Sequence, residues 1–236
     1  MQNIGLIGGY STYKILDNYS EITKGNLTCF KGRIGNKNVY IIPRHGKSHK
    51  FPPHRVPLID YFEFLKKNNV KDLVTVYSVG VINRNWKVPC LVVIDDFIDF
   101  TGELATIYDF FDKQPVHVEM DEPYFKPYKK IITKVTEQSN IPLYHGVYFQ
   151  TIGPRLETKA EIRAARIFGA DVVGMTHSWE AILAREYCMR LLSLGMGVNY
   201  ACGIKNKINS EDIINESRAF SEKTIKLIKK FIERVN

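Results

Sequence analysis

The stretch that most limits the fold of this chain is residues 146–174, where an alternating apolar segment, a short break, a helix and a second apolar segment follow one another. The alternation runs up to Gly153, where a Gly-Pro pair ends it. Thr158 and Glu161 have the spacing of a capping box, which predicts that a helix begins there. Gly169 supplies a helix stop, and the apolar run after it predicts a buried strand. The stretch therefore predicts a βαβ unit.

This unit also predicts where the functional residues lie. In open α/β sheets, ligands bind beyond the carboxyl ends of the strands. Residues 153–157 and 174–180 follow the two predicted strands, so we expect them side by side at one rim of the sheet.

The length and composition suit one α/β domain over residues 1–236, with a central mixed sheet flanked by helices. The chain has 236 residues and is 44% apolar, enough for one buried core. The formal charge is +8, but a cluster of lysines in residues 223–234 surrounds an apolar stripe and predicts a solvated helix face rather than a nucleic-acid surface. No apolar run approaches the roughly 20 residues that span a bilayer, and no leader is evident, so we expect no membrane association and a cytoplasmic location.

Further elements follow from periodicity and turn residues. The pattern predicts strands over residues 3–7, 39–42, 73–81, 91–94 and 196–200, and helices over residues 57–67, 181–194 and from 210 onward. Residues 110–128 are aromatic and loop-like, and we expect a lid or an oligomer contact there.

Three loops at strand ends contain residue types that can bind an anion or a metal ion. Gly8-Gly9 allows backbone amides to approach an anion. Arg44 and His45 form a cationic loop whose donors suit a phosphate, although a structural ion pair is an alternative for Arg44. Residues 95–99 contain three aspartates, for which loop capping is favoured over a magnesium site. The four cysteines lack zinc or redox spacing, so no metal site is predicted.

The order of the motifs resembles the trimeric purine nucleoside phosphorylase and methylthioadenosine phosphorylase family. The resemblance covers residues 4–204 and is carried by Gly8-Gly9, Arg44-His45-Gly46 with His49, Asp96-Phe97-Ile98-Asp99, Glu122-Pro123, residues 153–158, residues 169–176, Glu180-Ala181, Ala184-Arg185-Glu186 and Asn199-Tyr200-Ala201.

The resemblance implies a pentosyltransferase of purine salvage. Such an enzyme cleaves a purine nucleoside by phosphorolysis to a free base and a ribose 1-phosphate, or its 5-methylthio analogue. Inorganic phosphate is the second substrate, and neither a metal nor an organic cofactor is implied. The resemblance also implies a homotrimer or a dimer of trimers.

The resemblance assigns roles to particular residues. It places Gly9, Ser11, Arg44, His45, Ser78 and Thr176 on the phosphate, and Val79, Gly80, Leu156, Glu157, Gly174, Met175, Asn199, Ala201 and His117 on the nucleoside, with His117 often reaching a neighbouring subunit's site. The catalytic residues implied are Asn199, Glu157 and His45. His49 and His54 are open to interpretation as loop histidines without a substrate role.

The pair Glu157 and Asn199 favours a 6-oxopurine. An amide at position 199 can donate to O6 and accept from a protonated N7, and a carboxylate at position 157 can accept from N1-H. With adenine, the carboxylate faces a lone pair at N1, at a cost of about 1–3 kcal/mol.

Several positions depart from the family pattern and keep three hypotheses open. Those positions are Tyr10, Pro57-Leu58, Tyr77, Leu156 and residues 177–179. The first hypothesis is phosphorolysis of 6-oxopurine nucleosides, and the second is the same reaction with methylthioadenosine. The third, from another class, is a non-catalytic nucleoside-binding homologue, which Arg44 or His45 turned away from Thr176 would favour.

Overall fold

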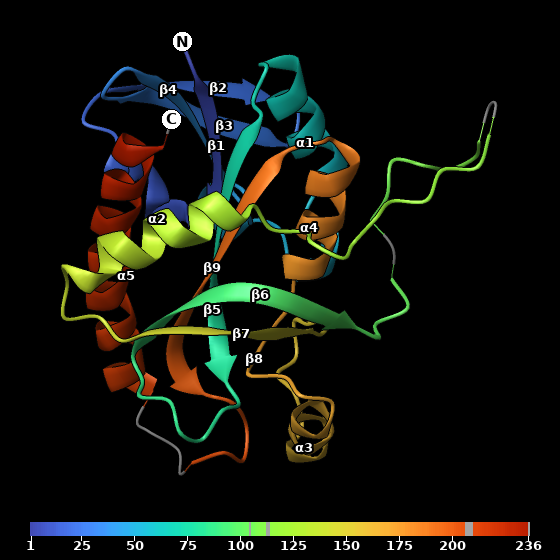
Figure 1. Cartoon of the computed structure of the whole chain (residues 1–236), viewed down its shortest axis with the longest axis vertical. Helices are drawn as coiled ribbons and strands as arrows, with labels where there is room; N and C mark the ends of the chain where they lie inside the picture. Colours follow the sequence, from blue (N-terminus) through green and yellow to red (C-terminus); the bar gives the residue numbers. More distant parts are fainter. Residues whose placement is uncertain (104, 112–113, 206–209, 236) are drawn as a thin grey trace.

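A nine-stranded mixed sheet forms the centre of the molecule (Figure 1). The computed structural model describes the backbone of residues 1–103, 105–111, 114–205 and 210–235, and the side chains of all of these except residues 10 and 210–218. The tyrosine at position 10, one of the departures, therefore lies outside the described side chains.

The strands and helices follow one another in an α/β order. The strands are β1 (Asn3–Gly8), β2 (Tyr19–Lys24), β3 (Leu27–Ile34), β4 (Lys37–Pro43), β5 (Asp72–Val81), β6 (Cys90–Asp99), β7 (Leu143–Gln150), β8 (Val172–Gly174) and β9 (Arg190–Tyr200). The α-helices of the described residues are α1 (Leu58–Lys67), α2 (Lys126–Glu137), α3 (Lys159–Ile167), α4 (His177–Glu186) and α5 (Ser210–Arg234). Short 3-10 helices are η1 (Tyr10–Ile15), η2 (Lys47–His49) and η3 (Pro53–Arg55).

The sheet has the order β2-β3-β4-β1-β5-β8-β7-β6-β9, and β9 also pairs with β5. Strands β5 to β9 thus close into a ring, while β1 to β4 extend from β5 as an open wing. β1, β4, β5 and β9 run parallel to a neighbour, whereas β2, β3 and β8 contribute antiparallel pairs. The expected mixed sheet flanked by helices is confirmed.

Helices cover both faces of the sheet. α2 and α5 pack on one face and contribute Tyr128, Ile132 and Phe231 to its core, and α1 and α4 pack on the other with Phe62 and Leu183 (Figure 1). The strands between them are apolar on both sides, as a doubly covered sheet requires. Along α5, Lys223, Lys226 and Lys230 face outward, as predicted.

The predicted βαβ unit is confirmed. β7 and β8 pair in parallel, with α3 between them in the chain. Thr158 is the N-cap of α3: its hydroxyl accepts from the Glu161 amide, and the Glu161 carboxylate accepts from the Thr158 amide. Gly169 follows the helix with a φ of 93°, a value that glycine adopts without strain.

The helix predicted over residues 181–194 is confirmed only for residues 181–186 and is wrong beyond them. α4 begins at His177 and ends at Glu186, and residues 190–200 form the long strand β9. Cys188 makes the turn between them with a φ of 55°. The run of leucines in β9 is buried on both sides, and a fully buried strand has no alternation that separates it from a buried helix. Pro57 is the N-cap of α1 rather than its first residue.

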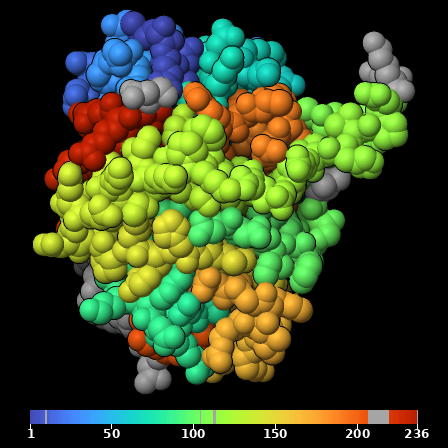
Figure 2. Space-filling view, viewed as in Figure 1, coloured from blue at the N-terminus to red at the C-terminus, as the bar shows by residue number. Residues whose placement is uncertain are grey.

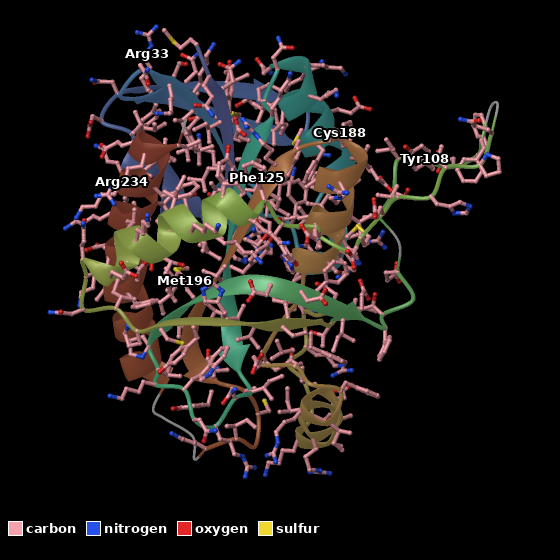
Figure 3. The ribbon with its side chains drawn as sticks, viewed as in Figure 1. Arg33, Tyr108, Phe125, Cys188, Met196 and Arg234 are labelled. Carbon is pink, nitrogen blue, oxygen red and sulfur yellow. The ribbon has the colours of Figure 1, made fainter. Side chains whose placement is uncertain are left out.

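Other elements were not predicted. The hairpin of β2 and β3 and the helix α2 were missed, and residues 95–99 continue β6 instead of forming a loop. The segment between β6 and α2 carries no described helix or strand, and part of it stands away from the body (Figures 1 and 2) before the chain returns to the core at Tyr124. Tyr108, labelled in Figure 3, lies on this segment. Across the described residues, no helix is long and apolar enough to cross a membrane.

Candidate functional site

A cavity of about 370 Å³ lies at the strand ends where the sequence places the functional residues. Its lining residues are Gly9, Arg44, His45, His49, Pro53, Val76, Tyr77, Ser78, Val79, Gly80, Tyr148, Leu156, Glu157, Val173, Gly174, Met175, Thr176, Met196, Asn199, Ala201 and Cys202. Met196 of β9 is labelled in Figure 3. The parallel strands β1, β4, β5 and β9 end at the same edge, so the residues that follow each of them meet here.

A bulge in β9 sets the position of Asn199. The pairing with β5 shifts register between Val79 and Gly80, so that Gly80 lies opposite Asn199. Bulges re-aim side chains at strand ends. The Asn199 Nδ2 donates to the Tyr200 carbonyl at 3.0 Å, which leaves Oδ1 and one N–H of the amide for a ligand.

Glu157 also lines the cavity and is only 8% exposed. The Thr151 hydroxyl donates to Glu157 Oε1 at 2.9 Å, and its oxygen also lies 3.1 Å from the Gly174 carbonyl. Oε2 of Glu157 has no hydrogen-bond partner among the described residues. Glu157 and Asn199 therefore leave two acceptors and one donor without a protein partner, and we call these two residues the base end, after the role that the resemblance implies for them.

Arg44 also lines the cavity and is held by a buried ion pair. Its Nε donates to Glu180 Oε1 at 2.5 Å and its Nη2 to Oε2 at 3.1 Å. Nη1 donates to the Val76 carbonyl at 2.7 Å, and Nη2 reaches the Ile7 carbonyl at 3.3 Å. Four of the five guanidinium N–H groups thus have protein acceptors. The sequence predicted that the guanidinium donors of Arg44 bind phosphate and gave a structural ion pair as the alternative. The ion pair is present, and one N–H group of Arg44 remains without a protein acceptor.

Tyr77 completes this ion pair. Its hydroxyl donates to Glu180 Oε2 at 2.7 Å, and the Arg44 guanidinium lies 4.1 Å from the centre of its ring. Burial and the negative charge of Glu180 raise the pKa of Tyr77 well above its usual value, so the phenol stays protonated and donates. The tyrosine that departs from the family pattern therefore supports Arg44.

His177 is the buried residue behind this network. It packs against Tyr77 and Tyr148, and its Nε2 lies 2.6 Å from the Tyr124 hydroxyl. Nδ1 is buried without a partner among the described residues. Burial, with a smaller contribution from the Arg44 charge, lowers the pKa of His177 to about 3, so the imidazole is neutral at ordinary pH.

His45 and His49 form a stacked pair on the wall next to Arg44. Their ring centres are 4.3 Å apart and the planes differ by 13°. His45 Nδ1 lies 2.8 Å from the Phe51 carbonyl. Burial lowers the pKa of His45 to about 4, the hydrogen bond to Phe51 opposes this, and Arg44 and His49 lower it further. We call Arg44, His45, His49 and the polar groups around them the phosphate end.

Small residues and hydroxyls complete the phosphate end. Ser78 is exposed in the cavity, and Thr176 is the N-cap residue of α4 but does not use its hydroxyl to cap it. A Cβ on Gly174 would lie 2.2 Å from the Tyr148 hydroxyl, so only glycine fits beneath that phenol. Leu156 lines the rim and is 70% exposed.

Most of the predicted site residues line this cavity, and two do not. Ser11 lies on η1 outside the lining, and His117 is exposed on the projecting segment. The structure adds His49 and Tyr148. His49 follows His45 by four residues, a spacing that could have indicated a shared wall, but Tyr148 gave no signal beyond its position on a strand.

The aspartates of residues 95–99 serve structural contacts. Asp95 pairs with Lys129, while Asp99 accepts from Thr101 and from the Ser178 hydroxyl. Within the part of the chain that the structure describes, no three His, Cys, Asp or Glu side chains gather as a metal site would require.

Comparisons with known proteins identify the family of this chain. The family model described as "Phosphorylase superfamily" matches residues 4–233. The chain is 38% identical over 206 residues to a probable S-methyl-5'-thioinosine phosphorylase of Methanopyrus kandleri, covering 86% of this chain and 80% of the relative. It is 35% identical over 242 residues to the 6-oxopurine nucleoside phosphorylase of Pyrococcus furiosus, covering 97% and 91%.

A solved structure has the same fold over nearly the whole chain. The methylthioadenosine phosphorylase from an antarctic soil metagenomic library superposes with a TM-score of 0.90 at 25% identity, covering 98% of this chain and 85% of that one. Since the family model and these relatives span almost all of the chain, this protein belongs to the phosphorylase superfamily, of the purine nucleoside and methylthioadenosine phosphorylase type.

Proposed function

We propose that this protein cleaves the glycosidic bond of a 6-oxopurine nucleoside, or of its 5'-methylthio analogue, with inorganic phosphate as the nucleophile. The products are the free purine and ribose 1-phosphate or 5-methylthioribose 1-phosphate. The observation that carries the proposal is the hydrogen-bond arrangement of Asn199 and Glu157 in one cavity. Relatives named for methylthioinosine and for 6-oxopurine nucleosides support it.

The base end supplies leaving-group activation. As the bond breaks, negative charge develops on the purine and positive charge on the sugar. Asn199 donates to O6 with its free N–H and accepts from a protonated N7 with Oδ1, and Glu157 accepts from N1-H. The hydrogen bond from Thr151 occupies one carboxylate oxygen of Glu157 and leaves the other oxygen for the base.

The phosphate end holds the nucleophile. Thr176, Ser78, the Gly9 backbone and His45 surround the phosphate, and Arg44 adds its remaining N–H. Met175 packs on the ribose. No metal and no organic cofactor take part in this proposal.

The assembly and setting are part of the same proposal. We propose a homotrimer or a dimer of trimers. In this assembly His117, on the projecting segment, contacts the nucleoside in a neighbouring subunit's cavity. Ser11 contacts the phosphate once the ligand is bound. We further propose a cytoplasmic location and a role in purine salvage.

The test is release of free base from inosine, methylthioinosine and methylthioadenosine, each with and without phosphate. Phosphate-dependent release from the first two and little from the third is the expected result. Rapid release from methylthioadenosine would keep the reaction and overturn the base preference. Methylthioadenosine is the second candidate substrate because a solved structure of the same fold is named as a methylthioadenosine phosphorylase.

A third outcome concerns catalysis itself. If the protein binds nucleoside but releases no base, it is a non-catalytic homologue. The feature that motivates this alternative is Arg44, most of whose donors are taken by Glu180, Val76 and Ile7.

A further inference from the structure

The phosphate end carries less positive charge than its residue types suggest. Arg44 and Glu157 are the residues with a formal charge that line the cavity within the described part of the chain. The charge of Arg44 is balanced by Glu180, which is fully buried against it. Glu157 adds a negative charge at the other end. A phosphate dianion would therefore enter a cavity without net positive charge, which disfavours it electrostatically.

The hydrogen bond of His45 fixes which nitrogen faces a ligand. The Phe51 carbonyl can only accept, so the proton of the neutral imidazole lies on Nδ1, 2.8 Å from that oxygen. Nε2 then carries a lone pair and has no hydrogen-bond partner among the described residues. The environment keeps this imidazole neutral, because burial and Arg44 both lower its pKa.

A lone pair on Nε2 repels the oxygens of a fully deprotonated phosphate. The contact becomes a hydrogen bond only when a proton lies between the two atoms, either on the imidazole or on the phosphate. Both forms have the same composition, the dianion plus one proton from solvent, and no bond to phosphorus is made or broken.

We propose that phosphate binds in this cavity together with one proton, which His45 Nε2 and a phosphate oxygen share. This inference rests on the proposed function, since it concerns the phosphate of the same site. It explains how a site with a neutralised arginine holds an anion.

Other titratable groups face the same cavity and must be separated from His45. They are Arg44, His49, Tyr77, Tyr148, Glu157 and Cys202. The phenols of Tyr77 and Tyr148 have raised pKa values and are already protonated. Glu157 lies at the base end. His49, stacked on His45, is the alternative proton acceptor that an experiment must test.

The test is calorimetric titration of the full-length protein with inorganic phosphate at about pH 8, in several buffers of different ionisation enthalpy. At that pH phosphate in solution is mainly the dianion. The dependence of the binding heat on the buffer gives the number of protons taken up, and we expect about one per phosphate. Binding without proton uptake would overturn the proposal.

Sulfate provides a second readout, because it does not take up a proton in this range. Its binding requires protonated His45, so its affinity should fall about tenfold for each pH unit above about pH 4, where the imidazole of the free protein loses its proton. A sulfate affinity independent of pH would contradict the proposal.

Three variants locate the proton. His45→Asn keeps an N–H for the Phe51 carbonyl but removes Nε2, and should bring proton uptake near zero while weakening phosphate binding about tenfold. His54→Asn, an exposed histidine outside the cavity lining, is the control and should retain uptake. Loss of uptake in His49→Asn with retention in His45→Asn would overturn the assignment to His45.

The same experiments separate this inference from the function on which it rests. Phosphate-dependent base release with phosphate binding but no proton uptake contradicts the inference alone. Absence of both phosphate binding and base release contradicts the proposed function and the inference together.

Discussion

The two ends of the cavity are both built from residues that follow strands, but they are held in different ways. At the phosphate end, Arg44 is fixed by Glu180 and Tyr77 in a network that is buried from solvent. At the base end, Glu157 and Asn199 are held by single bonds to a hydroxyl and to a backbone carbonyl. A change in the Arg44 network therefore affects both ligand binding and the stability of the fold. A change at Glu157 or Asn199 affects recognition of the ligand with little effect on stability.

Two of the departures from the family pattern belong to this buried network. Tyr77 lines the cavity and donates to Glu180, and His177 packs against Tyr77 outside the lining. Changes at the phosphate end should therefore lower stability, whereas changes at the base end should alter substrate preference in a protein that remains folded.

The largest effect is expected from Glu180→Ala. Removing the carboxylate leaves the Arg44 charge buried without its partner, and breaking such a pair costs about 3–5 kcal/mol. Urea denaturation would measure the free energy of unfolding. Glu63→Ala removes an exposed pair with Lys67 and serves as the control, with a loss of about 0.5 kcal/mol or less. Equal losses in the two variants would remove the contrast between the two ends.

Acid should weaken the fold through His177. Its pKa is lowered to about 3 in the folded protein, against about 6.5 in an unfolded chain. The unfolded chain therefore binds more protons between these values, so the free energy of unfolding falls as the pH drops from about 6.5 toward 3 and is unaffected above that range. The loss is on the order of a few kcal/mol.

Denaturation series at several pH values would measure this dependence on His177. His177→Gln should reduce the pH dependence and leave a smaller part that comes from His45, whose pKa is also lowered, to about 4. His54→Gln, at an exposed position, should leave the dependence unchanged. A wild-type slope that persists in His177→Gln would assign the acid sensitivity to other groups.

Asn199→Asp should change base preference without unfolding the protein. A carboxyl group can accept from the exocyclic amine of adenine and deliver a proton to N7. We expect the ratio of kcat/KM for methylthioadenosine to that for methylthioinosine to rise about tenfold or more. The free energy of unfolding should fall by only about 1 kcal/mol, because the variant loses the one bond that the Asn199 amide donates to the Tyr200 carbonyl. An unchanged ratio would contradict the proposed contact with the base.

The smallest effect is expected from Thr151→Val, which keeps the shape of the side chain and removes its hydroxyl. Glu157 loses one neutral donor, worth about 1 kcal/mol, so kcat/KM for inosine should fall several-fold. Thr133→Val removes a hydroxyl bond of similar length on α2, far from the lining, and should leave kcat/KM unchanged. Equal effects of the two valines would show that Thr151 does not act through Glu157.

Much of the fold followed from local chemistry. The capping box of Thr158 and Glu161 and the glycine stop at Gly169 are local features, and both appear in the structure. The helix predicted over residues 181–194 failed beyond residue 186 because burial of β9 on both sides removed the alternation that would have identified a strand. The hairpin of β2 and β3 was missed although its pairing is regular.

The sequence by itself determined the βαβ unit, the residue types at the strand ends and the family, because capping, turn residues and motif spacing are properties of neighbouring positions. Only the tertiary structure decided which donors are free. Arg44 and Glu180 are separated by 136 residues in the chain, and their contact depends on where the fold places the end of β4 and the helix α4. Since a buried charge must find a partner wherever the fold provides one, the state of a site arginine depends on distant residues rather than on its motif.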